Sequence, residues 1–210
     1  MSSALSIKSH HRKASGQKPE AEKVLLIRLP CNPIFPIGPI YLADHLHKCF
    51  PDIPQEILDL AALPVLDVER VLITRIDNFR PSLLVFSWRD IQTYAPVDGR
   101  GGNPLQNSFE VFYAKNPIKR LRGALGGLRL MASHYGELRR NQHLVKKGLN
   151  HARLHKKHTR AVLGGGAVSV FYEQLGKSSL PKGTIISIGE GEPLLEKLLR
   201  GESIQEERCF

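Results

Sequence analysis

Five short apolar runs divide the chain, and segments with helical periodicity lie between them. Each run consists mainly of Val, Ile, Leu and Phe without alternating polar residues, which is typical of strands buried on both faces of a parallel sheet. They lie at residues 24–27, 57–58, 83–86, 161–163 and 184–188. Strands that alternate with helices predict an α/β fold with right-handed crossovers. We therefore expect a five-stranded parallel sheet with helices on both faces, in the flavodoxin-like order 2-1-3-4-5.

The helices between the strands are predicted from apolar residues three and four positions apart. Asp67 is expected to be the N-cap of one of them. Residues 95–107 are rich in Gly, Pro and Asn and predict a long loop. The expected helices cover residues 37–49, 68–76, 117–135, 137–158, 168–175 and the segment that follows Glu192. The helix over 137–158 is basic on one face, and we expect it to be an extension between the third and fourth strands.

The 210 residues fit one domain with attached tails. We expect the α/β domain to span residues 23–202. Residues 1–22 are polar and basic without periodicity and predict a disordered tail. Residues 203–210 are expected to be a second tail, leading towards a domain outside this chain.

Cysteine usage and hydropathy indicate an intracellular protein. The three cysteines contain no CxxC pair, which excludes a disulfide scaffold and a four-cysteine zinc site. No run of about 18 apolar residues exists to span a membrane. The N-terminus lacks the apolar core of a secretory signal. We expect a cytoplasmic location.

The net charge of +10 comes from one segment. Residues 115–160 hold thirteen Lys/Arg and one Glu, whereas residues 24–114 and 161–210 are slightly acidic. Such a segment attracts RNA or an acidic partner through nonspecific electrostatics. Apart from histidines, Tyr135 is its only aromatic residue, so a base-stacking platform is poorly supplied. An interaction module with at most weak nonspecific RNA binding is therefore the alternative function.

Ligands of open α/β sheets bind at the carboxyl ends of the strands. Four loops meet there in the expected fold, at residues 30–38, 87–93, 164–167 and 189–192. Two of them are glycine-rich and precede helices, where exposed N–H groups suit a phosphate or polar ligand tail. Neither fits GxGxxG or the P-loop pattern, so simple tight turns remain the alternative interpretation.

Four motifs in this order carry a family resemblance. They are PIGPIYLA at 36–43, RPSLLVFS at 80–87, GGG at 164–166 and IGEGE at 188–192. Together they resemble the cobalamin-binding N-terminal domain of class B radical S-adenosylmethionine proteins, over residues 23–202. FYAKNPIKRLRGALGGLRL and GGGAVSVFYEQLG also resemble a branch named for photosystem II high-light acclimation.

The resemblance implies a cobalamin whose corrin lies over the strand ends and whose nucleotide tail lies near the glycine loops. The implied binding residues are Pro36, Gly38, Ser87, Trp88, Gly164, Gly165, Gly166, Gly189, Glu190, Gly191 and Glu192. Relatives hold a [4Fe–4S] cluster and S-adenosylmethionine through CxxxCxxC in a following barrel domain. This chain contains no CxxxCxxC and ends at Phe210. We expect an N-terminal part of such a protein, with the barrel as a partner and no complete catalytic site of its own.

The family's DxHxxG motif, which supplies a histidine to cobalt, is missing because Asp44, His45 and His47 have the wrong spacing.

The remaining candidates have ordinary explanations. His151, His155 and His158 share a helical face, but neighbouring Lys and Arg residues repel a cation, which favours a solvated face over a metal site. Glu190 and Glu192 suit a helix N-terminus without being a catalytic pair. Trp88 is either a stacking or a packing residue, and Ser87 has no recognisable His/Asp partner. No catalytic or metal-ligating residue is predicted.

Overall fold

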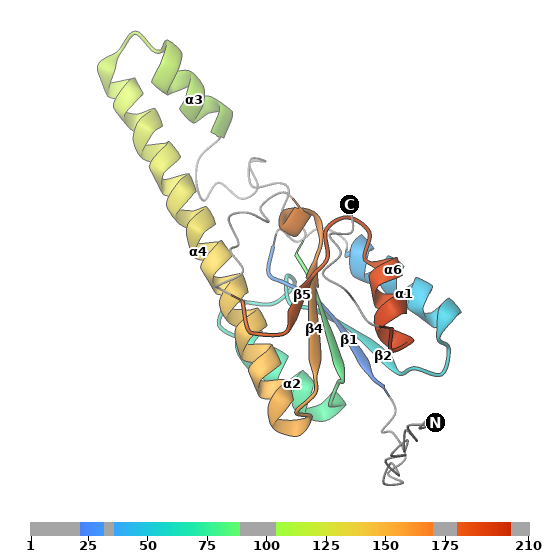
Figure 1. Ribbon diagram of the computed structural model, residues 1–210. Helices are drawn as coiled ribbons and strands as arrows, with labels where there is room; N and C mark the ends of the chain where they lie inside the picture. The colour runs from blue at the N-terminus through green and yellow to red at the C-terminus, as the bar shows by residue number, and fades with distance from the viewer. Residues whose placement is uncertain (1–21, 32–35, 89–103, 170–179, 203–210) are drawn as a thin grey trace, which may run out of the picture.

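The computed structural model describes residues 22–31, 36–88, 104–169 and 180–202 (Figure 1). Its centre is an all-parallel five-stranded sheet in the order β2-β1-β3-β4-β5. The strands are β1 (Val24–Arg28), β2 (Gln55–Asp59), β3 (Leu83–Ser87), β4 (Arg160–Gly164) and β5 (Thr184–Ile186). The predicted α/β class and strand order are therefore confirmed.

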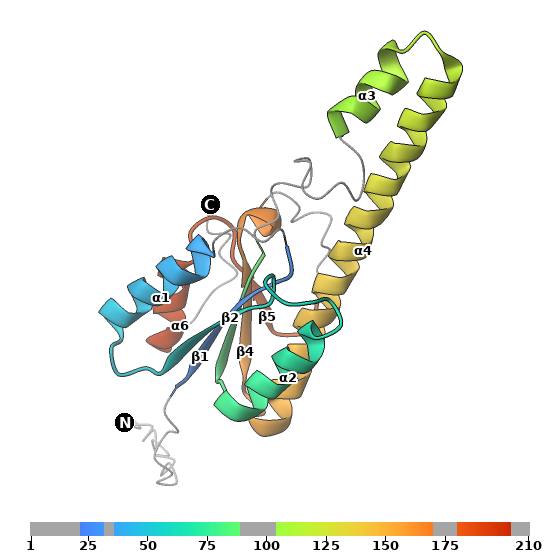
Figure 2. The same cartoon turned by 180° about the vertical axis from the view of Figure 1, so that it is seen from behind.

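Helices cover both faces of the sheet (Figures 1 and 2). One face carries α1 (Ile37–Cys49) and α6 (Glu192–Leu199). The other carries α2 (Val68–Phe79) and the C-terminal part of α4 (Pro117–His155). Alternate residues of each strand point to opposite faces, so β1 contributes Leu25 and Ile27 to one core and Val24 and Leu26 to the other. All five residues of β1 are buried, as a strand covered on both sides requires.

The strand register aligns the carboxyl ends of the three central strands. Arg28 lies opposite Ser87, and Ser87 lies opposite Gly164. The loops after β3 and β4 therefore begin side by side at one edge, which is where the ligand site was expected.

A helical hairpin projects beyond the sheet (Figures 1 and 2). It consists of α3 (Pro104–Tyr113) and the N-terminal part of α4, and we call residues 104–135 the α3–α4 hairpin. The two helices approach closely at Gly123 and Gly126. An added Cβ at Gly123 would lie 2.7 Å from the carbonyl oxygen of Asn107, and one at Gly126 would lie 2.5 Å from its side chain.

The structure corrects the sequence interpretation in this region. The predicted loop over 95–107 is helical from Pro104, and residues 95–103 lie outside the described part of the chain. The separate helices predicted over 117–135 and 137–158 form one helix through Gly136. A single glycine weakens a helix by only about 1 kcal/mol, so the strong helix formers on both sides keep the helix continuous across Gly136.

The segment predicted as a basic extension over 137–158 is instead the crossover helix of the sheet, and it ends at His155. Its apolar residues pack in the core with residues of α2, and its basic face points outward. The fully or nearly fully buried ones are Leu144, Val145, Leu149 and Ala152. The part that projects is the preceding hairpin.

Three smaller expectations differ or stay untested. The side chain of Asp67 makes no capping hydrogen bond, because its backbone is already helical and its carboxylate accepts from Arg70 at 2.8 Å. The fifth strand has three residues rather than five. Residues 166–169 are helical, but the rest of the helix predicted to residue 175, and the tails over 1–21 and 203–210, lie outside the described residues. Within the ranges described, no helix combines the length and apolarity needed to cross a membrane.

Candidate functional site

The carboxyl ends of β3 and β4 form part of a cavity of about 310 Å³, which we call the glycine cavity. The start of α1 and the loop between β5 and α6 complete its wall. The structure brings eight of the expected binding residues to this wall: Gly38, Ser87, Gly164, Gly165, Gly189, Glu190, Gly191 and Glu192. Its lining is largely apolar with a few polar groups, the usual character of a small-ligand site.

Pro36, Trp88 and Gly166 are not part of this wall. Pro36 precedes α1 and accepts a backbone hydrogen bond from Ile40 at 3.2 Å. The Trp88 side chain is buried in the core under α2 and α4, so it packs and does not present its ring at the strand ends. Gly166 begins the short helical segment that follows β4.

Two glycines of the wall are required by backbone geometry alone. Gly165 has φ +107°, and an added Cβ would lie 2.5 Å from the carbonyl oxygen of Trp88. That carbonyl accepts from the N–H of Ala167 at 3.1 Å, which fixes the turn. Gly189 has φ +85°. The tight-turn interpretation therefore accounts for these two residues, because L side chains rarely adopt such φ values.

Ser187 gives the glycine cavity a feature that turn geometry does not explain. The residue is 2% exposed and lies on the cavity wall, yet its Oγ has no hydrogen-bond partner among the described residues. An unpaired buried hydroxyl costs about 1–3 kcal/mol. A ligand that bonds to this hydroxyl would recover that loss. The sequence did not single out Ser187, because it lies inside the run predicted to be the fifth strand.

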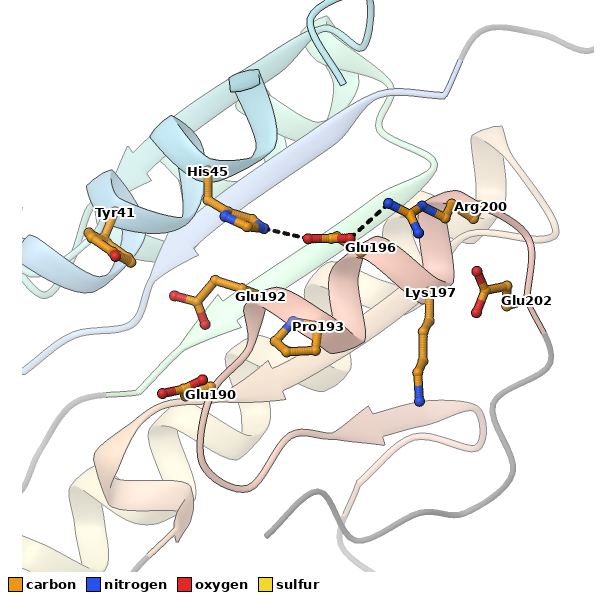
Figure 3. A pocket seen from close by; sticks show the side chains of 9 residues that line it. All are labelled: Tyr41, His45, Glu190, Glu192, Pro193, Glu196, Lys197, Arg200 and Glu202. Atoms are coloured by element: carbon orange, nitrogen blue, oxygen red, sulfur yellow. Dashed lines mark hydrogen bonds and ion pairs between the residues drawn. The ribbon is translucent and has the colours of Figure 1, made fainter. Parts of the chain in front are cut away.

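A second cavity of about 520 Å³ lies between α1 and α6, and we call it the acidic cavity (Figure 3). It shares Tyr41, Glu190 and Glu192 with the glycine cavity. In it, His45 Nε2 lies 2.9 Å from Glu196 Oε1, and Arg200 donates to Glu196 Oε2 at 2.9 Å.

Sequence reasoning did not identify the His45–Glu196 pair. His45 and Cys49 stand four residues apart on a predicted helix, a spacing that offers two ligands on one face. Glu196 lies 147 residues beyond Cys49, and only the packing of α6 beside α1 brings it there.

Two of the three histidines assigned to a solvated face have a partner. His151 and His155 lie 2.6 and 2.7 Å from the same oxygen of Asp77 on α2. Hydrogen bonds from His151 and then His155 hold the pKa of Asp77 below its usual value. His158 lies beyond the end of α4. The face thus joins α4 to α2 instead of being only solvated.

Comparison of the chain with protein family models, curated proteins and solved structures found no match. The parallel sheet and the residues around the glycine and acidic cavities are therefore the basis of the functional proposals.

Proposed function

We propose that the glycine cavity binds a corrinoid of the cobalamin type, and that the chain is the cofactor-binding part of a radical S-adenosylmethionine protein. The observation that carries the proposal is the convergence of eight expected residues and the unpartnered Ser187 hydroxyl on one cavity at the strand ends. The motif resemblance names the ligand class, and the cavity is where that class of ligand would be expected.

The size of the cavity fits part of such a ligand. About 310 Å³ is at the lower end of the range for small-molecule sites. It accommodates a nucleotide-like tail, whereas a whole corrin ring would have to lie outside, over the strand ends. Gly164 keeps the wall open, because a Cβ there would crowd the Ser187 side chain at 3.2 Å. Ser187 would then donate to or accept from the tail.

The bound cofactor would supply organometallic chemistry at cobalt, and this chain would hold and orient it. The absent DxHxxG motif means that no histidine from that motif reaches cobalt. The absent CxxxCxxC means that radical chemistry belongs to a barrel domain, which we propose as the partner. In the absence of that domain we expect cofactor binding without turnover.

The test is retention of hydroxocobalamin by the purified chain. Wild type mixed with micromolar hydroxocobalamin should keep a red colour and a shifted corrin spectrum after desalting. Gly38→Leu should weaken binding at least tenfold, because Gly38 lines the cavity and has room for a Cβ, 3.7 Å from Ser87 Oγ. The matched control is Gly127→Leu in α4, where an added Cβ meets no atom within 4 Å.

Two results would contradict the proposal. Release of all cobalamin by wild type at micromolar concentration would leave only the α/β scaffold, since a fold does not fix a function. Binding by Gly38→Leu as tight as that of wild type would place the ligand away from the glycine cavity.

A second candidate function concerns the α3–α4 hairpin. Its exposed apolar residues on α4 follow a heptad-like spacing, as in the seam of a coiled coil. They are Ile118, Leu121, Leu125, Leu128 and Tyr135, with exposed fractions from 48% to 75%. Arg129 occupies a position beside this seam, and so does Arg122, whose guanidinium already pairs with Glu110 on α3. We propose that it binds an acidic amphipathic helix, because the spacing suits a helix and the flanking charge suits acidic side chains.

RNA is the competing ligand for this basic region, and a titration separates the two. A labelled helical peptide with Leu seams and Glu flanks, and a labelled single-stranded RNA, are each titrated at about 0.05 and 0.2 M salt. Leu121→Ser with Leu128→Ser should weaken peptide binding at least tenfold and leave RNA binding unchanged. Submicromolar RNA affinity that survives the higher salt, without peptide binding, would overturn this candidate in favour of RNA.

A further inference from the structure

We propose that His45, Cys49 and Glu196 form a binding site for a divalent transition-metal ion, Zn²⁺ by their ligand chemistry. The site lies at the acidic cavity, and it is independent of the proposed corrinoid. Imidazole, thiolate and carboxylate are the three side-chain ligand types that Zn²⁺ takes in proteins. Among the described residues, no other cluster of three or more His, Cys, Asp or Glu side chains includes a thiol.

The three donor atoms already converge. His45 Nε2 lies 2.9 Å from Glu196 Oε1, and Cys49 Sγ lies 3.8 Å from each of these atoms. Ligands of tetrahedral zinc, with bonds of about 2.0–2.3 Å, lie about 3.3–3.6 Å apart. Adjustments of a few tenths of an ångström would therefore admit the ion. An ordinary His–Glu ion pair explains the first distance but gives no reason for a thiol equidistant from both partners.

The local structure favours this arrangement. His45 and Cys49 are four residues apart on α1, so they project from the same face of the helix. Glu196 comes from α6, and Figure 3 shows its carboxylate directed at His45 on one side and at Arg200 on the other. Arg200 holds Oε2 at 2.9 Å and so orients the carboxylate, leaving Oε1 for the metal.

The surroundings of the site attract cations and leave room for a further ligand. Glu190, Glu192 and Glu202 line the same cavity, as Figure 3 shows, and their carboxylates outnumber the cations of Lys197 and Arg200. Cys49 is exposed, and the side chains of His45 and Glu196 are 30% and 26% exposed, so an ion can enter from solvent. Three protein ligands beside an open cavity resemble a zinc site that keeps one position for water or substrate.

The other histidine cluster is less suited to a metal. His151 and His155 both lie against the same oxygen of Asp77, at 2.6 and 2.7 Å, which two hydrogen bonds satisfy without an ion. It contains no thiol, and the cations of Arg153 and Lys156 stand beside it in the sequence. It therefore serves as the internal control.

Cobalt substitution tests the proposal, because Co²⁺ bound to a thiolate gives a near-ultraviolet charge-transfer band and tetrahedral sites give intense visible bands. The full chain, reduced and stripped of metal, is titrated with CoCl₂. We expect both sets of bands to saturate at one Co²⁺ per chain and to disappear when Zn²⁺ is added. Cys49→Ser should abolish the charge-transfer band, and Glu196→Gln should weaken Co²⁺ binding at least tenfold.

Matched variants make the outcome decisive. Cys31→Ser and Cys209→Ser should keep the charge-transfer band, and His151→Ala with His155→Ala should keep both sets. Loss of the band in either cysteine control, or its survival in Cys49→Ser, would overturn the proposal, as would a wild-type chain without bands. Circular dichroism checks that each variant is folded. Hydroxocobalamin retention is measured separately, so failure of one proposal does not decide the other.

Discussion

The sheet domain buries its apolar side chains, whereas the α3–α4 hairpin exposes most of its own. In the domain, β1 and β3 bury every Val, Leu, Ile and Phe, and helices cover them on both sides. In the hairpin, the buried contact uses Gly123 beside Asn107 and Glu110, while leucines and aromatic residues face outward. The domain is therefore held by apolar burial, and the hairpin by a close approach of backbones.

One helix contains both behaviours. Along α4, Leu144 and Leu149 are at most 3% exposed, whereas Leu121 and Leu128 are both 63% exposed. The same residue type in the same secondary structure thus contributes to folding at one end of the helix and is available for binding at the other. What differs is the neighbour: a sheet and α2 at one end, and only a short glycine-packed helix at the other.

The largest expected effect separates these two uses of an apolar side chain. Phe86→Ala should lower the free energy of unfolding by about 3–5 kcal/mol, because the ring is fully buried between the sheet and α4. Leu128→Ala, at an exposed position, should change it by less than about 0.5 kcal/mol. Urea unfolding followed by circular dichroism measures both. A loss above 2 kcal/mol for Leu128→Ala would mean that the hairpin seam is covered in solution.

The next effect tests the glycine packing of the hairpin. Gly123→Leu should separate α3 from α4, because a Cβ there would lie 2.7 Å from a backbone oxygen and 2.8 Å from Glu110 Cβ. Overpacking of about 1–3 kcal/mol predicts that α3 amides exchange about tenfold faster or more. Hydrogen exchange read by mass spectrometry measures this, with Gly127→Leu as control. Equal exchange in both variants would show that the two helices do not depend on Gly123.

The domain could be predicted from the sequence because its signal is local. Runs such as residues 24–27 and 83–86 are short and apolar at every position, which is typical of a strand covered on both faces. The hairpin could not be predicted, because Leu121, Leu125 and Leu128 have the spacing of any amphipathic helix. Nothing in that spacing says that no core lies opposite them.

The candidate sites divide in the same way. The glycine loops follow strands directly, so their place at the strand ends could be inferred from the chain order. Ser187 could not be inferred, since its lack of a partner is a property of packing. The meeting of His45 and Cys49 with Glu196 depends on two helices distant in sequence, and a sequence pattern does not specify that approach.

The titration of the Glu110 carboxyl tests the polar part of the contact between α3 and α4. Hydrogen bonds from Arg122, and secondarily from Gln106, lower the pKa of Glu110 from 4.5 to about 2. Its contribution to the α3–α4 contact is therefore present above pH 4.5 and is lost as the pH falls towards 2. Carboxyl-carbon NMR of labelled protein should show Glu110 titrating near pH 2. In Arg122→Gln its pKa should return towards 4.5; a wild-type value already near 4.5 would contradict the Arg122–Glu110 pairing.

The smallest expected effect lies at the junction of the two regions. Gly136 is exposed within α4, and an added Cβ would meet no atom within 4 Å. Gly136→Ala should therefore stabilise the helix by about 0.5–1 kcal/mol through backbone entropy alone. Packing of α4 against the core of the domain begins at Leu138, which is partly buried, so Gly136 lies just before it, in the part that opens with the hairpin.

We therefore expect the gain from Gly136→Ala in the hairpin and not in the domain. Amides of residues 117–135 should exchange about two- to fivefold more slowly, since 1.4 kcal/mol corresponds to a factor of ten. The urea midpoint of the domain should stay unchanged, because its unfolding is governed by the buried strands and helices. A raised midpoint together with slower exchange in the hairpin would show instead that hairpin and domain unfold as one unit. The two regions would then differ in their surfaces and not in their stability.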